Sequence, residues 1–439
     1  MKPYRSPSTI IAVTFFLFAQ FIVASLIHAE PFIVEDGQAN ACIVIAEEPP
    51  RMVGLAAEEL QIYLEKITGA QLPIHAEPDE DYPVSIYVGQ SSYTDELGVS
   101  GEGLDFGAFR MISGPDYLVL LGDDFDYQPL EISDEDWAEM TDSTWRNPLA
   151  EGRQRNQETG IWSYDEGGSL YAVYEFLRSL GVRWYMPGEL GEVIPEMTSI
   201  PLPEMDKTVH PDYPLRYWIW AGARYQTFDR DTILFERRVG AGTRYEILGN
   251  TRLTHGLRNV HGRAEMQKAH PEYYALMGGE RDIHSHGTGH ACFSSDGLVD
   301  ETANYARAVF DHFDAPLVQL SPQDGFQQCE CEDCAPMSPS DNVFTFLDQV
   351  ARKVHETHPD RIILSAGYTS YRDPPEAIDQ FSPNFAISIN NMGRPRFGDT
   401  DYWNHYMDLV KSWEQKLAPN RIIRVENTRY GADPVPVIH

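Results

Sequence analysis

One short segment in the second half of the chain combines a carboxylate, a glycine and three closely spaced thiols. The run 316–320 just before it is predicted to form a short buried strand. Active sites of parallel α/β proteins are built at the carboxyl ends of strands, so a functional loop is expected here. Its residues are Asp324, Gly325, Cys329, Cys331 and Cys334, and Cys292 lies about one strand–helix unit earlier.

The four thiols of this region could support the loop in more than one way. Four thiolates form a closed tetrahedral zinc site, which would be structural and would hold the loop beside Asp324. Export of the protein would favour disulfides instead, and a fifth cysteine, Cys42, makes the count odd. The sequence leaves three states open: a structural zinc on Cys292, Cys329, Cys331 and Cys334, disulfides, or reduced thiols. No cofactor is expected to be required for catalysis.

Two carboxylates fall at the ends of predicted strands. Asp324 follows the fourth strand of the second half, and Glu426 ends the seventh. Two carboxylates that face one cleft suit the cleavage of a glycosidic bond, and their separation decides whether the reaction retains or inverts configuration. The simpler interpretations are a turn former before Gly325 for Asp324, and a solvated strand end or an ion-pair partner for Glu426.

Polar and aromatic residues recur at the ends of the predicted strands. Flat aromatic faces together with amide, guanidinium and imidazole groups suit a ligand with many hydroxyls and apolar C–H faces. A single aromatic residue on such a strand is more often part of the core, so the argument depends on the recurrence. The candidate substrate-binding residues are Arg216, Trp220, Asn250, His255, Tyr368, Asn390, Asn391 and Tyr430.

The first half of the mature chain, residues 30–205, is predicted to form a small α/β domain. An amphipathic helix is expected over 50–69, strands over 84–88 and 117–121, and a second helix over 170–180. A long acidic segment, 123–166, interrupts this pattern and is expected to be functional or mobile.

Residues 206–439 show a repeated strand–loop–helix pattern, which predicts a (β/α)8 barrel of the TIM type. A closed barrel of this kind needs eight strands, and seven are predicted. Either one of these strand assignments is wrong or the sequence is truncated; we favour truncation and expect a barrel that is incomplete at its C-terminus. The predicted strands are 215–220, 245–249, 289–294, 317–321, 361–366, 385–390 and 421–426, and helices are expected over 300–312, 341–358 and 401–413.

The first 29 residues are predicted to be a signal peptide. Lys2 and Arg5 precede an apolar stretch over 10–27, and Ala29 offers a small residue for cleavage. The stretch is about as long as a membrane span, so an uncleaved N-terminal anchor is the alternative. We expect a secreted or periplasmic protein.

The charge balance argues against anionic partners. The chain has 34 Lys and Arg residues against 67 Asp and Glu residues, which gives a net charge of −33. A field of this sign repels nucleic acids and anionic membrane surfaces. It also keeps a protein soluble, and it identifies no substrate.

Several of these segments resemble known families. The run 56–74 and the run 171–188 resemble the small domain that precedes the barrel in family 67 alpha-glucuronidases and family 20 hexosaminidases. The runs 270–276 and 292–294, with Ser321-Pro322-x-Asp324-Gly325 and the cysteine motif, resemble the domain-of-unknown-function family 4838. The resemblance implies a glycoside hydrolase-like barrel in exported bacterial proteins that use polysaccharides.

The resemblance also bears on individual residues. Arg216 matches, by its place on the first strand, the sugar-binding arginine of family 20. That family carries an adjacent Asp-Glu pair after its fourth strand, whereas this chain has Asp324-Gly325. The leading hypothesis is an exported glycoside hydrolase-like enzyme that acts on a polysaccharide or oligosaccharide. The alternatives are a non-catalytic carbohydrate-binding protein and an inactive truncated homologue.

Overall fold

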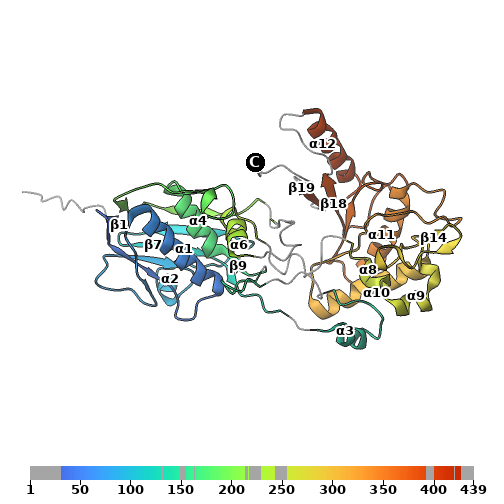
Figure 1. Cartoon of the computed structure of the whole chain (residues 1–439), viewed down its shortest axis with the longest axis horizontal. Helices are drawn as coiled ribbons and strands as arrows, with labels where there is room; N and C mark the ends of the chain where they lie inside the picture. Colours follow the sequence, from blue (N-terminus) through green and yellow to red (C-terminus); the bar gives the residue numbers. More distant parts are fainter. Residues whose placement is uncertain are drawn as a thin grey trace, which may run out of the picture.

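The described residues of the computed structural model fold into two lobes (Figure 1). The predicted signal peptide, Trp220, Asn250 and Tyr430 lie outside these residues. Among the described residues, no helix is long and apolar enough to cross a membrane. The structure describes residues 31–129, 132–148, 155–162, 164–212, 216, 229–242, 255–391, 400–419 and 421–426.

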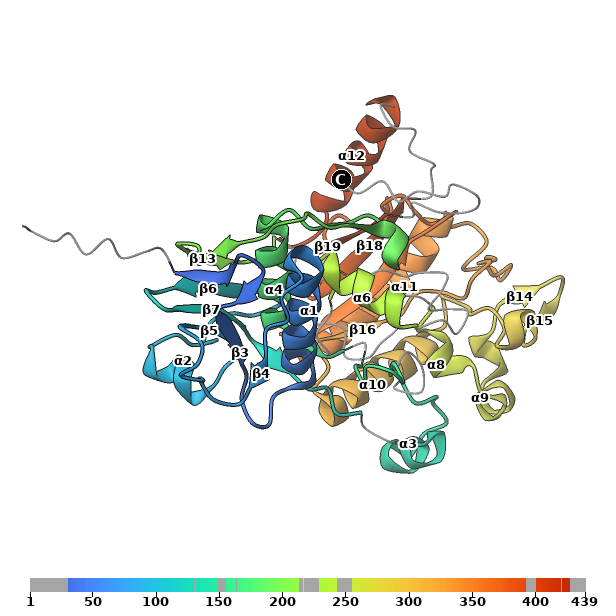
Figure 2. The ribbon, with the colours of Figure 1, turned by 60° about the vertical axis from the view of Figure 1, so that its left-hand side comes forward.

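The N-terminal lobe is built on a mixed six-stranded sheet (Figure 2). Strands β4, β3, β5 and β7 run parallel, and β6 and β13 continue the sheet in antiparallel fashion. The strand order is β13 (Asp206–Val209), β6 (Phe109–Ser113), β7 (Tyr117–Gly122), β5 (Val84–Val88), β3 (Ala41–Val44) and β4 (Ile74–His75).

Helices α1 (Arg51–Thr68) and α4 (Gly168–Ser179) pack against each other and against this sheet. The helix predicted over 50–69 forms because Leu60, Tyr63 and Leu64 share one face and are buried there. It ends at Gly69, whose φ of 78° lets the chain turn away while its N–H bonds the Glu65 carbonyl.

Small elements surround this sheet. Strand β1 pairs with β2 and β12, β10 pairs with β11, and β8 pairs with β9. These elements are β1 (Phe32–Glu35), β2 (Gln38–Ala39), α2 (Ser92–Glu96), β8 (Asp124–Phe125), β9 (Glu166–Gly167), β10 (Arg183–Trp184), η1 (Glu189–Gly191), β11 (Glu192–Val193) and β12 (Ile200–Pro201).

The C-terminal lobe contains a parallel four-stranded sheet in chain order, β16 (Leu317–Gln319), β17 (Ile362–Gly367), β18 (Phe385–Asn391) and β19 (Ile422–Glu426). Helix α10 (Asp296–Phe313) precedes β16, α11 (Pro339–His355) lies between β16 and β17, and α12 (Thr400–Glu414) lies between β18 and β19, whereas β17 and β18 are joined by a loop. The remaining elements are α8 (Arg258–His261), α9 (Ala264–Ala269), η2 (Pro271–Tyr273), β14 (Leu276–Met277), β15 (Glu280–Arg281) and η3 (Ser285–Gly287).

The described residues therefore show a mixed α/β fold, in which no closed barrel is present. Four of the seven predicted strands correspond to β16–β19, and the strand predicted over 289–294 is wrong. Gly289 has a φ of 75°, and only Ala291 makes an isolated bridge, to Tyr274. The strands predicted over 215–220 and 245–249 lie outside the described residues, apart from Arg216.

The boundary predicted at 205/206 does not separate the two cores, because one segment from each half packs on the other lobe. Helix α3 (Asp134–Thr141) lies beneath α10 (Figures 1 and 2), where Trp137 stacks on Phe313 with ring centroids 5.0 Å apart. Helix α6 (Arg230–Arg238) lies beside α4, and its Phe235 is buried in the N-terminal core.

Candidate functional site at the carboxyl ends of the parallel strands

The carboxyl end of β16 is held by a buried polar network. The Ser321 hydroxyl accepts a bond of 2.8 Å from the Ala366 N–H, which ties β16 to the end of β17. The side chain of Gln319 donates to Ser321 and accepts 2.7 Å from the N–H of Gly256. A Cβ at Gly256 would lie 1.8 Å from the Gln319 carbonyl oxygen, so only glycine allows this approach.

His255 lies next to this network in a strained conformation. Its φ is 57°, a region that residues other than glycine rarely adopt and that costs about 1–3 kcal/mol. Its Nδ1 lies 2.7 Å from the Pro322 carbonyl oxygen. Because a carbonyl can only accept, Nδ1 carries the proton, and in the neutral ring Nε2 is then a hydrogen-bond acceptor.

Asp324 lies two residues beyond Pro322, on the exposed part of the same loop. Its Oδ1 accepts a bond of 3.0 Å from the Gly325 N–H, and Gly325 has a φ of 66°. Phe326, in the same loop, meets the buried ring of Tyr371 edge to face, with ring centroids 5.2 Å apart. Burial raises the pKa of Tyr371 well above its ordinary value, and the nearby charge of Asp324 acts in the same direction.

The turn after β17 carries a second strained residue, which was not predicted. Thr369 is β-branched and has a φ of 45°, a conformation in which such a residue is an outlier. A hydrogen bond of 3.0 Å from the N–H of Tyr371 to the carbonyl of Tyr368 closes the turn around Thr369. Tyr368, a predicted ligand-binding residue, thus lies at the same edge as Asp324 and His255.

Three more predicted residues have their backbone at this edge, at the ends of the neighbouring strands. Asn390 and Asn391 end β18 and Glu426 ends β19, with Asn391 opposite Glu426 in register. Their side chains lie outside the described part of the structure.

Arg216 occupies a different place. Its Nε donates 2.7 Å to the Gly240 carbonyl and its Nη1 donates 3.0 Å to that of Phe106, while the guanidinium lies over the ring of Tyr171. These described contacts are with the N-terminal lobe and with the segment after α6. The structure therefore does not group Arg216 with Asp324.

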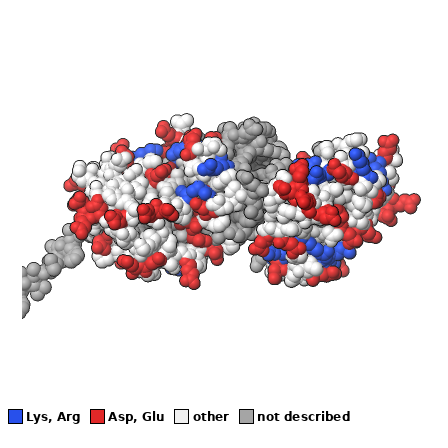
Figure 3. Space-filling model, turned by 90° about the horizontal axis from the view of Figure 1, so that it is seen from below, with Lys and Arg blue, Asp and Glu red and all other residues white. Residues whose placement is uncertain are grey.

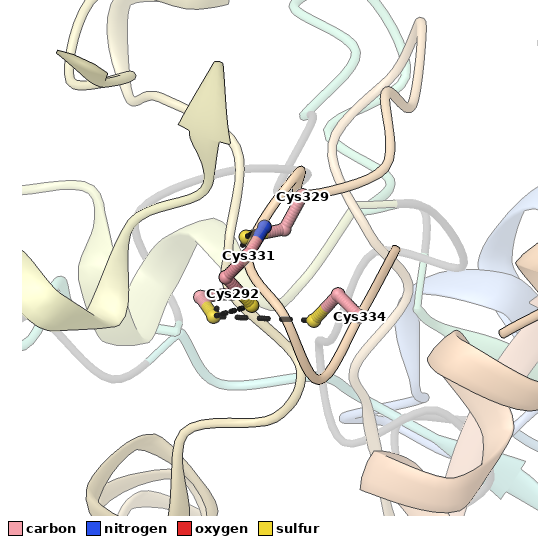
Figure 4. Close-up of side chains that lie close together, drawn as sticks. All are labelled: Cys292, Cys329, Cys331 and Cys334. Carbon is pink, nitrogen blue, oxygen red and sulfur yellow. Dashed lines mark hydrogen bonds between the residues drawn. The ribbon is translucent and has the colours of Figure 1, made fainter. Parts of the chain in front are cut away.

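The four predicted metal ligands converge at one point (Figure 4). The Sγ atom of Cys292 lies 3.6 Å from that of Cys329, 3.8 Å from that of Cys331 and 4.0 Å from that of Cys334. All four sulfurs lie within 4.8 Å of one another. None of them is in a disulfide, which would need a separation of about 2.05 Å.

Polar groups surround this thiol cluster closely. The Ser294 hydroxyl lies 3.4 Å from the sulfurs of Cys292 and Cys331 and 3.3 Å from that of Cys334. A hydrogen bond from Cys334 lowers the pKa of Cys292. That bond and burial together raise the pKa of Cys334 to about 12.

A hollow of about 530 Å³ in the N-terminal lobe was not predicted. Arg238 lies in its wall, but this charge is already paired, 2.8 Å from Glu59 and 3.2 Å from Glu192. Lys66, also in the wall, lies 2.8 Å from Glu192, so both of these cations are engaged in ion pairs within the chain. Its lining consists of Glu59, Ile62, Lys66, Met186, Pro187, Gly188, Glu189, Leu190, Glu192, Arg230, Asp231 and Arg238.

Acidic side chains are spread over both lobes on the face shown in Figure 3, and basic ones form smaller groups between them. This distribution agrees with the net charge of −33, and it favours a neutral or cationic ligand over a polyanion.

Comparisons with known proteins give one family and weak structural likenesses. Residues 186–423 match the family described as a domain of unknown function (DUF4838). Among curated proteins, none matches the chain. A family GH115 4-O-methyl-alpha-glucuronidase with specificity for decorated arabinogalactans is similar in structure, at 13% identity and a TM-score of 0.35. That match covers 89% of this chain and 54% of the glucuronidase, so the chain spans about half its length.

A second likeness is to the GH20 beta-N-acetylhexosaminidase from Streptomyces coelicolor A3(2). The identity is 12% and the TM-score 0.37, over 90% of this chain and 74% of the hexosaminidase. Likenesses this weak do not assign an activity to the chain.

Proposed function

The chain belongs to the DUF4838 family, whose description records no activity, and we propose from the site itself that it is an exported glycoside hydrolase-like protein. Its glycan would bind at the carboxyl ends of β16–β19. Asp324 would serve as the acid/base or substrate-orienting carboxylate. The predicted signal peptide would bring the protein to the compartment where such polymers occur.

The observation that carries this proposal is the strain at the edge that bears Asp324. His255 and Thr369 both hold positive φ angles, and the buried Gln319–Ser321 network fixes the strand ends between them. Strained backbone persists only where the surrounding structure over-determines it, and it concentrates at ligand-binding and catalytic sites. In open parallel sheets, ligands bind at the carboxyl ends of the strands.

The chemistry of this edge supports a sugar as the ligand. The Nε2 atom of His255 can accept a bond from a hydroxyl, and the exposed carboxylate of Asp324 can accept others. Phe326, two residues beyond that carboxylate, is partly exposed and offers apolar ring surface, while Tyr371 is buried behind it. A sugar has the matching combination of hydroxyls and C–H faces.

A hydrolase needs a second carboxylate near Asp324, whereas a protein that only binds glycans does not. Strands β16 and β19 are three spacings apart, which is about 14 Å in a flat sheet. Glycosidases need their two carboxyl groups about 5–9.5 Å apart. Hydrolysis by Asp324 and Glu426 therefore requires the sheet to curl, or the loop of Asp324 to reach across it. Without this, the same edge would be a non-catalytic carbohydrate-binding site.

The test compares two Asp→Asn variants with wild-type protein on a panel of polysaccharides and aryl glycosides. Asp324→Asn should lower turnover by at least about 100-fold, the usual contribution of general acid–base catalysis, while glycan binding remains. Asp360→Asn is the matched control, because Asp360 is exposed just before β17, at the opposite edge of the sheet. It should keep full activity.

Two outcomes would count against hydrolysis through Asp324. Equal sugar release by wild type and Asp324→Asn would remove this residue from the mechanism. Glycan binding by a cooperatively folded wild type that releases no sugar would support the binding-only function. Glycan binding by neither protein would overturn the proposal as a whole.

A further inference from the structure

We propose that Cys292, Cys329, Cys331 and Cys334 bind one zinc ion in a closed tetrathiolate site that fastens the loop of Asp324. Zinc binding itself is independent of the proposed function. Only its consequence for the glycan site rests on that function.

The distances between the sulfurs fit a single tetrahedral ion. Zn–S bonds of about 2.3 Å at tetrahedral angles place neighbouring sulfurs about 3.8 Å apart. The Cys292 sulfur lies 3.6, 3.8 and 4.0 Å from the other three. A disulfide would require one of these pairs to close by well over 1 Å, and Cys329 and Cys331 are too near in sequence to bond each other easily.

The hydrogen bonds around the sulfurs are those that thiolate ligands need. The N–H of Leu276 points at the Cys329 sulfur from 3.1 Å, and the N–H of Cys331 does so from 3.5 Å. Such donors stabilise negative charge on sulfur and orient the ligand. Ser294 lies against the face formed by the other three sulfurs, where its hydroxyl can donate to one of them.

The donor set and its burial favour a structural role for the ion. Soft thiolates select zinc over calcium or magnesium, which prefer oxygen. Cys292, Cys329 and Cys334 are buried and Cys331 is partly buried. With four protein ligands and Ser294 over one face, the ion has no open position for water or substrate, so it would not act in catalysis.

The zinc would join two separate segments, one of which also bonds a third. Cys292 lies just before α10, and the other three ligands belong to the loop between β16 and α11. Glu330, inside that loop, bonds the β14–β15 hairpin, with its N–H 2.8 Å from the Leu276 carbonyl and its Oε2 2.6 Å from the Gly278 N–H. The Asp324 loop would thus be held at Pro322 by His255 and at Cys329 by the ion.

The experiment measures metal and thiols in the purified full chain. Mass spectrometry should find roughly one zinc ion per wild-type chain. Cobalt exchanged into the site should give the intense visible bands and the sulfur-to-metal charge transfer of tetrahedral thiolate coordination. Cys292→Ser and Cys331→Ser should each lower the affinity for zinc by at least about tenfold in competition with a chelator, since ligand loss costs no less than loss of an outer partner. Cys42→Ser, which alters the buried cysteine of β3, should leave the metal content unchanged.

Thiol titration in denaturant with chelator separates the alternatives. The chain has five cysteines, so the zinc protein should release five thiols, whereas two disulfides would leave one. Wild type that releases one thiol, or that releases five and takes up neither zinc nor cobalt, would overturn the proposal. Iron in place of zinc would also overturn it. The cobalt spectrum of wild type does not depend on whether a variant folds.

The proposed function can fail without affecting this result. Asp324→Asn should keep the full zinc content whether or not it loses turnover, because Asp324 is outside the ligand set. Zinc-depleted protein should lose turnover only if the glycan site depends on the fastened loop.

Discussion

Each lobe contains a buried cluster of polar side chains, and the two clusters differ in the groups that compose them. In the N-terminal lobe, Arg238 lies between Glu59 and Glu192, so opposite charges from the chain itself complete the cluster. In the C-terminal lobe, four thiols face one another around a single point. The thiol cluster would be completed by the zinc ion proposed above, whereas a cluster of opposite charges is complete on folding. The first lobe should therefore respond to changes in charge and the second to metal.

The largest effect on the N-terminal lobe should come from Arg238→Met. Removing one partner of a buried ion pair leaves the carboxylate of Glu59 without a cation, which costs about 3–5 kcal/mol, whereas Glu192 keeps Lys66 at 2.8 Å. Urea unfolding with hydrogen exchange read on α1 measures this cost. Lys207→Met is the control, since Lys207 lies 2.8 Å from Glu175 in a largely exposed pair that is worth about 0–1 kcal/mol. Equal losses would show that Arg238 does not complete the cluster.

Two core substitutions, one in α3 and one in α6, test which lobe each of these helices stabilises. Trp137→Ala should destabilise the C-terminal lobe, and Phe235→Ala the N-terminal lobe, each by about 3–5 kcal/mol. Hydrogen exchange resolved by segment would read the two lobes separately. Met140→Ala, on the exposed side of α3, should cost less than about 0.5 kcal/mol. Faster exchange in the N-terminal sheet after Trp137→Ala would contradict the crossed packing.

A smaller effect, opposite in the two lobes, is expected from pH. Burial raises the pKa of Asp124 to about 7, so the folded N-terminal lobe keeps a proton that the unfolded chain releases near pH 4. This contribution to stability is complete below about pH 4 and is lost as the pH rises to about 7. Burial lowers the pKa of His261 in the C-terminal lobe to about 4. Its contribution is complete above about pH 6.5 and is lost as the pH falls towards 4.

Lobe-resolved hydrogen exchange between pH 4 and 8 would measure these opposite slopes. Asp124→Asn should flatten the slope of the N-terminal lobe and leave that of the C-terminal lobe alone. Asp81→Asn, at an exposed position in the same lobe, should change neither. If the stability of both lobes changed with pH in the same direction, the expected difference between the lobes would be wrong.

The elements that could be predicted are those whose signals are local. Helix α1 and strand β5 follow from periodicity, and the ends of α1 and α4 match the predicted helices within two residues. The thiol cluster was predictable because cysteines are few and three of them lie within six residues. Asp324 could be placed from the buried strand that precedes its loop.

The features that escaped prediction depend on contacts between distant residues. Trp145 bonds Glu301, 156 positions away, and nothing near Trp137 indicates which core it enters. The positive φ of Thr369 runs against the preference of its residue type, so only the surrounding fold can impose it. The segment 289–294 was predicted to be a strand, but it instead places Cys292 at the cluster and leads to Ser295 at the start of α10.

The crossed packing of α3 and α6 has a consequence for how such a protein can evolve. A cut at residue 205 would leave the first fragment without Phe235 and the second without Trp137, so each fragment would expose a cavity that the other one fills. The fragments should bind each other and regain structure on mixing, by complementation. For the same reason neither lobe can be shuffled into another protein by exchange at this point, and the two are expected to be inherited together as one unit.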